Sequence, residues 1–171
     1  MEILKILKKS NNLNYCEIFF GYEKNEDGNI IHKSISNEKI YNIIQKLKIF
    51  KLKSNKVCTE YYYNYLIKSE IEIINEIKIN YITRNIKHHY IDNILIIIKT
   101  IVDIEKEKFP EIKEYDYYTK KTISEYESDN FDIIIYNNEF NDTQLSLKIK
   151  DINYEKELIS FINKINELLQ I

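Results

Sequence analysis

Residues 57–81 read VCTEYYYNYLIKSEIEIINEIKINY, and this stretch decides the fold class. Its β-branched and aromatic side chains recur at every second position, which is the period of a β-strand. The alternating residues are Val57, Thr59, Tyr61 and Tyr63, followed by Ile71, Ile73, Ile77, Ile79 and Tyr81. Asn75 and Glu76 interrupt the alternation and shift its phase, which predicts a turn or bulge between two strands.

Upstream of this stretch, the sequence predicts one strand, one hairpin loop and two helices. Tyr15 to Tyr22 is strand-like, and the polar loop from Glu23 to Asn29 contains an Asp-Gly pair suited to a tight turn. Ser36 is a good N-cap for a helix with one apolar face, made of Ile40, Ile43, Ile44 and Leu47. Apolar residues at helical spacing also predict a short helix at the start of the chain, with Ile3, Leu4, Ile6 and Leu7 on one face.

Downstream, the pattern predicts three more strands and a terminal helix. The strands span Tyr115 to Tyr126, Phe131 to Tyr136 and Leu145 to Ile149. Apolar spacing predicts a C-terminal helix with one face made of Leu158, Ile159, Ile162, Ile165, Leu168 and Leu169. The segment from Tyr90 to Lys108 is long and apolar enough for a buried strand or a helix, and its spacing fits a helix somewhat better. Pro110 would then mark the end of that helix.

These elements add up to six to eight strands, with a helix near each end and one or two between. Because no βαβ alternation and no linker occur, we expect residues 1–171 to form a single α+β domain, built mainly on an antiparallel sheet. A two-sheet sandwich and a small barrel are both compatible with this pattern.

Composition limits the classes of partner. The net charge is −2 with both signs mixed along the chain, so charge does not favour nucleic acid as the partner. Two cysteines predict reduced thiols in a cytoplasmic, intracellular protein, and no apolar run approaches the roughly 20 residues of a membrane span. The abundant Ile, Lys, Asn and Tyr all have A/T-rich codons, which indicates an AT-rich genome, such as that of a large DNA virus, an intracellular parasite or a low-GC bacterium.

No catalytic constellation is complete in the sequence. Gly21 and Gly28 are the only glycines and cannot build a phosphate-binding loop. His88 and His89 are adjacent, so their side chains diverge on a strand or a helix. We therefore expect no catalytic residues, no metal ligands and no cofactor, and a protein that works by binding a partner.

Two dense tyrosine patches are the other distinctive feature. Exposed tyrosines bring large contact area at low entropic cost, which suggests an interaction surface at Tyr61, Tyr63, Tyr117 and Tyr118. A protein partner or self-association would use such a surface. Codon bias and the high β propensity of tyrosine explain the same patches equally well.

Several motifs together resemble a known enzyme family. The run YCEIFFG at 15–21, the polar loop and the helix from Ser36 to Leu47 resemble the opening of the triphosphate-tunnel RNA triphosphatases, which take part in mRNA capping in large DNA viruses and fungi. The similarity continues at TEYYY (59–63), KKTIS (120–124) and FDIII (131–135). The resemblance implies an antiparallel β-barrel in which acidic residues hold a divalent metal and basic residues hold a triphosphate.

The chain departs from that family at the metal site. Of the alternating glutamates in the family's first motif only Glu17 is present, and its last motif is matched by Gln144, Ser146 and Lys148. The resemblance therefore implies an inactive relative, in which Glu17, Lys120 and Lys121 are the candidates for phosphate binding.

These observations are compatible with three functions. The first is a non-catalytic binding or assembly subunit of a viral or viral-like transcription and mRNA-capping apparatus. The second is a small Mn- or Mg-dependent hydrolase of polyphosphate or RNA 5′-triphosphate ends. The third is a virion structural protein or a host-interaction protein.

Overall fold

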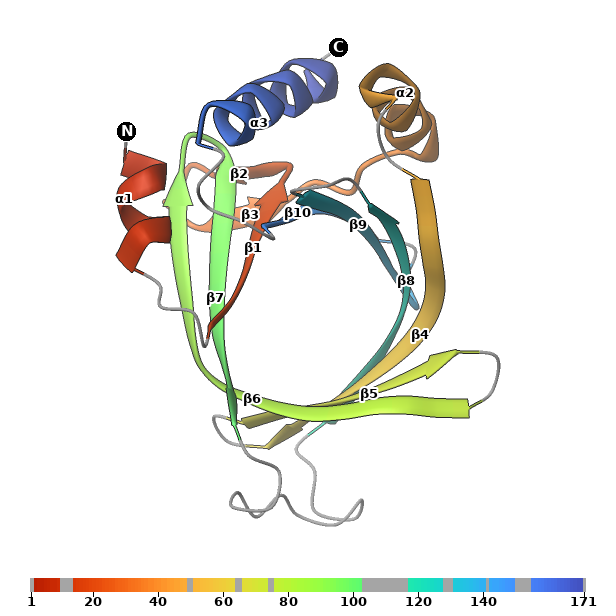
Figure 1. The fold of residues 1–171 in the computed structure, drawn as a ribbon. Coiled ribbons are helices and arrows are strands. Elements are labelled where there is room, and N and C mark those ends of the chain that lie inside the picture. Colours follow the sequence, from red (N-terminus) through yellow and green to blue (C-terminus); the bar gives the residue numbers. More distant parts are fainter. Residues whose placement is uncertain are drawn as a thin grey trace.

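The computed structural model describes residues 2–9, 14–48, 51–63, 66–73, 76–102, 117–127, 131–140, 142–149 and 155–170. Eight strands close into a barrel in the order β1-β10-β9-β8-β4-β5-β6-β7, and all neighbours are antiparallel (Figure 1). They are β1 (Asn14–Phe20), β4 (Lys51–Tyr63), β5 (Leu66–Ile73), β6 (Glu76–Ile91), β7 (Ile94–Val102), β8 (Tyr117–Glu127), β9 (Phe131–Asn138) and β10 (Thr143–Ile149). The short strands β2 (Tyr22–Lys24) and β3 (Ile30–His32) pair in a separate hairpin.

Three helices pack on the outside of the barrel: α1 (Glu2–Lys9), α2 (Asn37–Leu47) and α3 (Glu155–Leu169). Figure 1 shows α2 and α3 over the same side of the barrel, with α1 beside β6 and β7. The Ser36 hydroxyl accepts a hydrogen bond from the Lys39 backbone N–H at 3.2 Å, so α2 begins at the predicted N-cap. The apolar faces of the helices cover the outer faces of β1, β7, β9 and β10 and form the main core, which includes Leu7, Ile43, Ile162, Ile96 and Leu147.

The two faces of the barrel wall differ around the circumference. Under the helices the strands are buried on both sides, because their other side chains point into the barrel. Away from the helices the outer face meets solvent, where Leu52, Val57 and Tyr118 remain exposed. This arrangement explains the clear alternation in 57–81 and the near-continuous apolar runs elsewhere.

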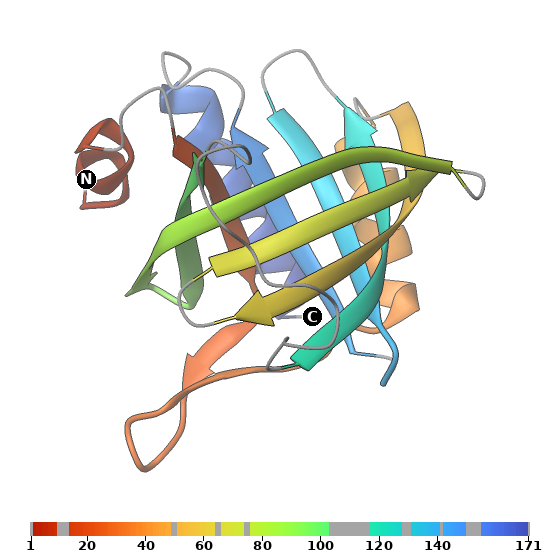
Figure 2. The same ribbon diagram turned by 90° about the horizontal axis from the view of Figure 1, so that it is seen from below.

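Irregular positions bend the sheet enough to close it. The register shifts between Leu52 and Ser54 on β4, between Ile71 and Glu72 on β5, and between Arg84 and Lys87 on β6. Strand β6 is 16 residues long, so it pairs with β5 along its first half and with β7 along its second (Figure 2). Bulges at such corners increase the local twist and allow one strand to turn from one neighbour to the next.

The structure confirms an α+β fold built on an antiparallel sheet, and a barrel is formed instead of a sandwich. The helix that the spacing favoured for Tyr90 to Lys108 is wrong for the part of this segment that the structure describes, which ends at Val102. A turn at Asp92 and Asn93, both with positive φ, joins β6 to β7 there. Strand β7 has no alternation because Ile94, Ile96 and Ile98 pack under the helices while the residues between them face the barrel interior. Pro110 lies outside the described residues.

Within the described residues, none of the helices is both long and apolar enough to cross a bilayer.

Candidate binding site inside the barrel

The barrel interior holds a cavity of about 210 Å³ in which charged side chains from five strands meet. Its lysines come from β4, β7, β8 and β10, and are Lys56, Lys99, Lys121 and Lys148. Its acidic residues come from β1, β4 and β8, and are Glu17, Glu60 and Glu125. Charged groups in such a position need partners, because moving a charge out of water is costly.

Glu17 is held by two hydroxyl groups. The Tyr136 hydroxyl lies 2.8 and 2.7 Å from its two carboxylate oxygens, and the Ser146 hydroxyl donates to Oε2 at 2.7 Å. Glu17 is 3% exposed, and these contacts come from strands β9 and β10, more than 100 residues further along the chain. Burial raises the pKa of Tyr136 well above its ordinary value, and the neighbouring Glu17 carboxylate raises it further. The tyrosine is therefore a hydrogen-bond donor at all ordinary pH values.

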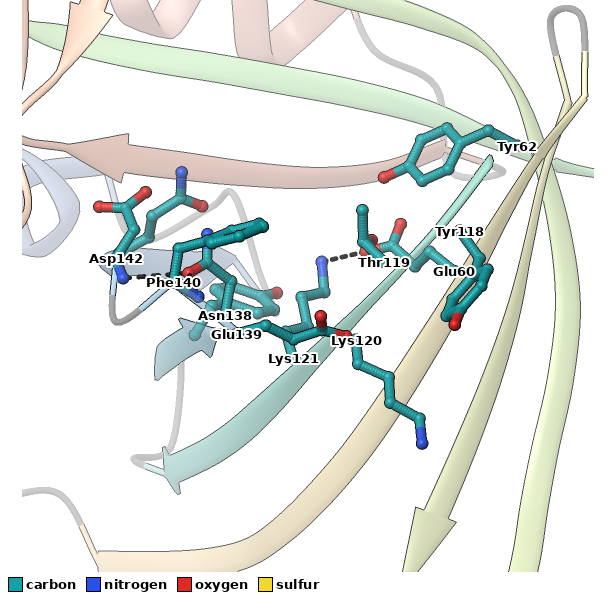
Figure 3. Close-up of a pocket in the computed structure, with 12 residues that line it drawn as sticks. Glu60, Tyr62, Tyr118, Thr119, Lys120, Lys121, Asn138, Glu139, Phe140 and Asp142 are labelled. Atoms are coloured by element: carbon teal, nitrogen blue, oxygen red, sulfur yellow. Dashed lines mark hydrogen bonds and ion pairs between the residues drawn. The ribbon is translucent and has the colours of Figure 1, made fainter. Parts of the chain in front are cut away.

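Glu60, which is buried, and Lys121, which is partly buried, form an ion pair across the β4–β8 interface (Figure 3). Burial alone would raise the pKa of Glu60, but the Lys121 ammonium, with Lys99 farther away, outweighs burial and holds that pKa below its ordinary value. Burial alone would lower the pKa of Lys121, but Glu60 outweighs it and raises that pKa. The Lys121 ammonium also lies 4.7 Å from the centre of the Tyr136 ring. Both groups are thus charged, and Tyr136 connects this pair to Glu17.

Further ion pairs follow the interior toward the other end of the barrel. Lys56 Nζ lies 3.1 Å from Glu125 Oε1. Lys53 Nζ, which is half-exposed, lies 3.9 to 4.0 Å from carboxylate oxygens of Glu125, Glu127 and Asp132. Most of the interior charge is therefore neutralised by the protein itself.

An apolar cluster occupies the rest of the barrel interior. It contains Phe19, Cys58, Ile71, Leu95, Ile123, Ile134 and Tyr136. The Phe19 and Tyr136 rings stack with centroids 5.7 Å apart. Burial raises the pKa of the Cys58 thiol to about 11, so this cysteine is a protonated, inert packing residue at neutral pH.

A second cavity of about 260 Å³ opens where β8 begins and β9 ends (Figure 3). It shares Glu60, Lys121 and Tyr136 with the interior cavity, so these three side chains lie between the two spaces. Its outer wall carries Phe140 on the β9–β10 turn and Tyr118 on β8.

The β2–β3 hairpin covers this same end of the barrel. Gly21 has a φ of +82°, which allows the chain to turn out of β1. The Tyr22 ring then packs against the interior cluster and its hydroxyl accepts a hydrogen bond from the Gln144 side chain at 3.3 Å. His32 contacts the Tyr22 ring and lies 3.2 Å from Asp142, which joins the hairpin to the β9–β10 turn.

The candidate phosphate-binding residues lie on both sides of the barrel wall. Glu17 and Lys121 face the interior and are brought close by Tyr136. Lys120 is exposed, and Figure 3 shows its side chain directed away from the other residues drawn. The residues that match the family's last motif do face inward: Ser146 contacts Glu17, and Gln144 and Lys148 line the two cavities.

The tyrosine patches are also split by the strand alternation. Tyr61 and Tyr118 lie opposite each other on β4 and β8, with ring centroids 6.2 Å apart, and Tyr118 is 62% exposed. Tyr63 is half-buried, and the side chain of Tyr117 lies outside what the structure describes.

Two of the interior residues had no signal in the sequence. Tyr136 belongs to a strand predicted for its apolar residues, and Lys99 to the run that fitted a helix. Both could have been found only by knowing which strands neighbour β1 and β4, since the contacts of Tyr136 with Glu17 span 119 positions.

The interior does not fit the divalent metal that the sequence resemblance implies. A hard cation needs several oxygen ligands, preferably carboxylates with free lone pairs. Here both oxygens of Glu17 are taken by hydroxyl groups, Glu60 is paired with Lys121, and the inward residues Ser146 and Lys148 are not acids. Among the described residues, no group of three or more His, Cys, Asp or Glu side chains is arranged to hold a metal ion.

Comparison with known proteins identifies the fold. No family model and no curated protein matches the sequence. The RNA triphosphatase domain of a trifunctional mimivirus mRNA capping enzyme superposes with a TM-score of 0.66 at 12% identity, covering 99% of this chain and 96% of that one. The RNA triphosphatase Pct1 of S. pombe, solved in complex with the Spt5 CTD, gives 0.67 at 11% identity over 98% of this chain and 92% of that one.

An archaeal structure also matches, but less well. The PH1012 protein of Pyrococcus horikoshii OT3 gives a TM-score of 0.53 at 14% identity and covers 90% of each chain. The resemblance drawn from the sequence motifs is confirmed at the level of the fold: this chain folds as the viral and fungal RNA triphosphatases do.

Proposed function

We propose that this chain is a catalytically inactive binding subunit with the RNA triphosphatase fold, attached to a viral or viral-like transcription and mRNA-capping apparatus. The observation that carries the proposal is the hydrogen bonding of Glu17. Its two oxygens are occupied by Tyr136 and Ser146, both of which belong to the folded barrel.

The energetics support a structural role for this carboxylate. A hydrogen bond to a charged group contributes about 1.5 to 3 kcal/mol, and a metal ion would have to displace two of them from a fully buried acid. The Lys121 ammonium lies over the ring of Tyr136, whose hydroxyl binds Glu17. This positive charge would repel a metal ion bound at Glu17. The same interior that stabilises the barrel is therefore a poor metal site.

A protein partner is favoured by the exposed aromatic residues and by one of the similar structures. Tyr118 on β8 and Phe140 on the turn between β9 and β10 are exposed and line the same cavity. Aromatic side chains of this kind are enriched in protein interfaces. The S. pombe RNA triphosphatase with this fold was solved with the Spt5 CTD bound. A protein of this architecture can thus serve as a docking platform.

A phosphate-release assay tests the absence of catalysis. The protein is incubated with tripolyphosphate, or with RNA bearing a 5′-triphosphate, in the presence of manganese or magnesium. We expect no release above that of a Glu17→Gln variant, with Glu38→Gln on the exposed face of α2 as the matched control. Metal-dependent release that Glu17→Gln abolishes and Glu38→Gln retains would overturn the proposal.

A second candidate is the binding of an oligophosphate without hydrolysis, and Lys99 is the observation that favours it. Lys99 lines the interior cavity, and among the described residues it makes no ion pair within 4.0 Å. The cavity is lined by four lysines and three glutamates, so an anion there would meet a formal excess of one positive charge.

Thermal unfolding with added tripolyphosphate tests this second candidate. A ligand at a hundredfold its dissociation constant stabilises the native state by about 2.7 kcal/mol. We expect the rise in melting temperature to disappear in Lys99→Ala and to persist in Lys120→Ala, whose side chain lies outside the barrel. An equal rise in both variants would place the anion elsewhere.

A further inference from the structure

The β2–β3 hairpin is held against the barrel by side-chain contacts near its base. The Tyr22 ring packs on the interior cluster, and its hydroxyl accepts a hydrogen bond from Gln144. His32 contacts the Tyr22 ring and Asp142. Farther along, Ile30 is 42% exposed, and Figure 2 shows the hairpin projecting beyond the rim of the barrel. The position of the hairpin therefore depends mainly on Tyr22 and His32.

These basal contacts form the wall between two cavities. A cavity of about 500 Å³ lies between the hairpin, the start of α2 and the end of α3, and Tyr22 lines it. The 260 Å³ cavity at the barrel end is lined by Gln144 and Asp142, which bind Tyr22 and His32. This smaller cavity shares its inner wall with the charged interior cavity. Release of the hairpin would therefore remove the wall between the outer cavity and the barrel end.

His32 has one ring nitrogen that the docked hairpin leaves without a partner. The side chain is 9% exposed, and Nδ1 lies 3.2 Å from Asp142 Oδ1. Because a carboxylate can only accept, Nδ1 carries the proton and Nε2 has a lone pair. Among the described residues, none forms a hydrogen bond with Nε2, and a side chain at Gly21 would begin 3.5 Å from it. A second proton would therefore create a buried N–H group without an acceptor, which is unfavourable.

The charged groups around His32 do not remove this penalty. Asp142, on the β9–β10 turn, favours the protonated ring, but burial outweighs it and lowers the pKa of His32. On β2, Tyr22 is neutral, because burial raises its pKa to about 12. Glu23 and Lys33 at the base of the hairpin are paired with each other at 3.2 Å. The ring is thus neutral at pH 7 in the docked hairpin, and it binds a proton more readily once it is released into water.

The backbone at the base of the hairpin allows it to move as one unit. Gly21 has a φ of +82°, and a glycine adapts to large changes in backbone angles. The Lys33 N–H donates to the Gly21 carbonyl at 2.9 Å, which joins the two strands at their base. Beyond β3, the Ile35 N–H donates to the Thr143 carbonyl at 3.1 Å, and Ser34 Oγ accepts from the Thr143 N–H at 3.0 Å. Since β2 and β3 form a sheet separate from the barrel, the hairpin can turn about this anchor without breaking the barrel ladder.

We propose that the β2–β3 hairpin is a pH-sensitive lid over this end of the barrel. It is docked while His32 is neutral and moves outward when the ring gains its second proton, which exposes Tyr22 and joins the outer cavity to the barrel end. The ratio of open to docked lid rises by up to about tenfold for each pH unit below about 6.5. This inference concerns access to the interior, and it does not depend on what the interior binds.

A single tryptophan reports the position of the lid. The chain contains no tryptophan, so Tyr22→Trp places one fluorophore where the lid meets the barrel. We expect the acrylamide quenching constant to rise at least about threefold, and the emission to move to longer wavelength, as the pH falls from about 7.5 to about 5.5. His32→Gln in the same background should remove this pH dependence. His88→Gln, at an exposed histidine on β6, is the matched control and should retain it.

A distance measurement keeps the native tyrosine in place. Spin labels are attached at Asp27→Cys on the hairpin turn and at Lys46→Cys on α2, both exposed positions. The native thiols of Cys16 and Cys58 are poorly reactive, because burial raises their pKa values to about 12 and about 11. We expect a second distance between the labels to appear at about pH 5.5 and to be absent when His32→Gln is added.

Hydrogen exchange distinguishes movement of the lid from unfolding. The Ile35 amide belongs to the anchor and should keep its protection across the same pH range, once the intrinsic exchange rate is corrected for pH. Three results would overturn the proposal: quenching and label distance that do not change with pH, a change that persists in His32→Gln, or loss of Ile35 protection in parallel with the change. The outcome is independent of the phosphate-release assay, because these measurements involve neither Glu17 nor a ligand.

Discussion

Removing the Tyr136 hydroxyl tests the role of the interior network most directly. In Tyr136→Phe the ring keeps its volume and its stacking on Phe19, so packing is nearly unchanged. What is lost is the donor to Glu17, a carboxylate that is 3% exposed and cannot turn to water. Ser146 remains as a donor to one oxygen.

The magnitude follows from the number of protons involved. The tyrosine hydroxyl has one proton, shared between the two Glu17 oxygens at 2.8 and 2.7 Å, so one charge-assisted hydrogen bond is lost. Such a bond contributes about 1.5 to 3 kcal/mol, and we expect a free energy of unfolding lower by about 2 kcal/mol. For a chain of this size that corresponds to a melting temperature lower by about 4 to 8 °C.

Urea unfolding of a double-mutant cycle provides the measurement. The cycle combines Tyr136→Phe with Glu17→Gln, and the midpoint should shift with an unchanged slope. If the two side chains interact as described, their coupling energy should lie within about 0.5 to 3 kcal/mol. Tyr41→Phe, on an exposed helix face, is the matched control and should change stability by less than about 0.5 kcal/mol. Additive effects of the two interior substitutions would refute the network.

Three further predictions concern the ion pair, the helical layer and pH. Lys121→Met leaves Glu60 buried without its cation and should cost about 3 kcal/mol in urea unfolding, and adding Glu60→Met should recover most of the loss; no recovery would contradict a buried pair. Ile162→Ala removes a 3% exposed side chain from the contact of α3 with the barrel and should cost about 2 to 5 kcal/mol, whereas a cost below about 1 kcal/mol would mean that α3 is not part of the core. Burial lowers the pKa of His32, although the nearby Asp142 raises it in part, so His32 binds a proton more readily in the unfolded protein than in the folded one. The free energy of unfolding should therefore be unaffected above pH 6.5 and should decrease as the pH falls from 6.5 toward 5. His32→Gln should reduce that decline in thermal melts, and an unchanged decline would show that other groups cause it.

Part of the candidate site follows from the sequence because strand periodicity is local. The resemblance to the family's first and last motifs, together with strand alternation, placed Glu17 and residues 144, 146 and 148 at inward positions, and in the structure they do face the interior. The sequence did not show which of Lys120 and Lys121 faces the barrel interior. A shift of one residue in register moves a side chain to the other face of a sheet, and only the pairing of β8 with β4 and β9 decides it.

Residue types and their spacing were enough to identify an α+β protein with an antiparallel sheet, whose helices lie near the ends and after the first hairpin. These properties depend on residue types and on periods of two and 3.6 residues, which a single segment displays without its neighbours. Only the tertiary structure decided that Ile94–Val102 is a strand, since burial on both faces removes the alternation that would identify it. It also decided that Tyr136 and Ser146 hold Glu17, because contacts across more than 100 residues depend on which strands become neighbours when the barrel closes.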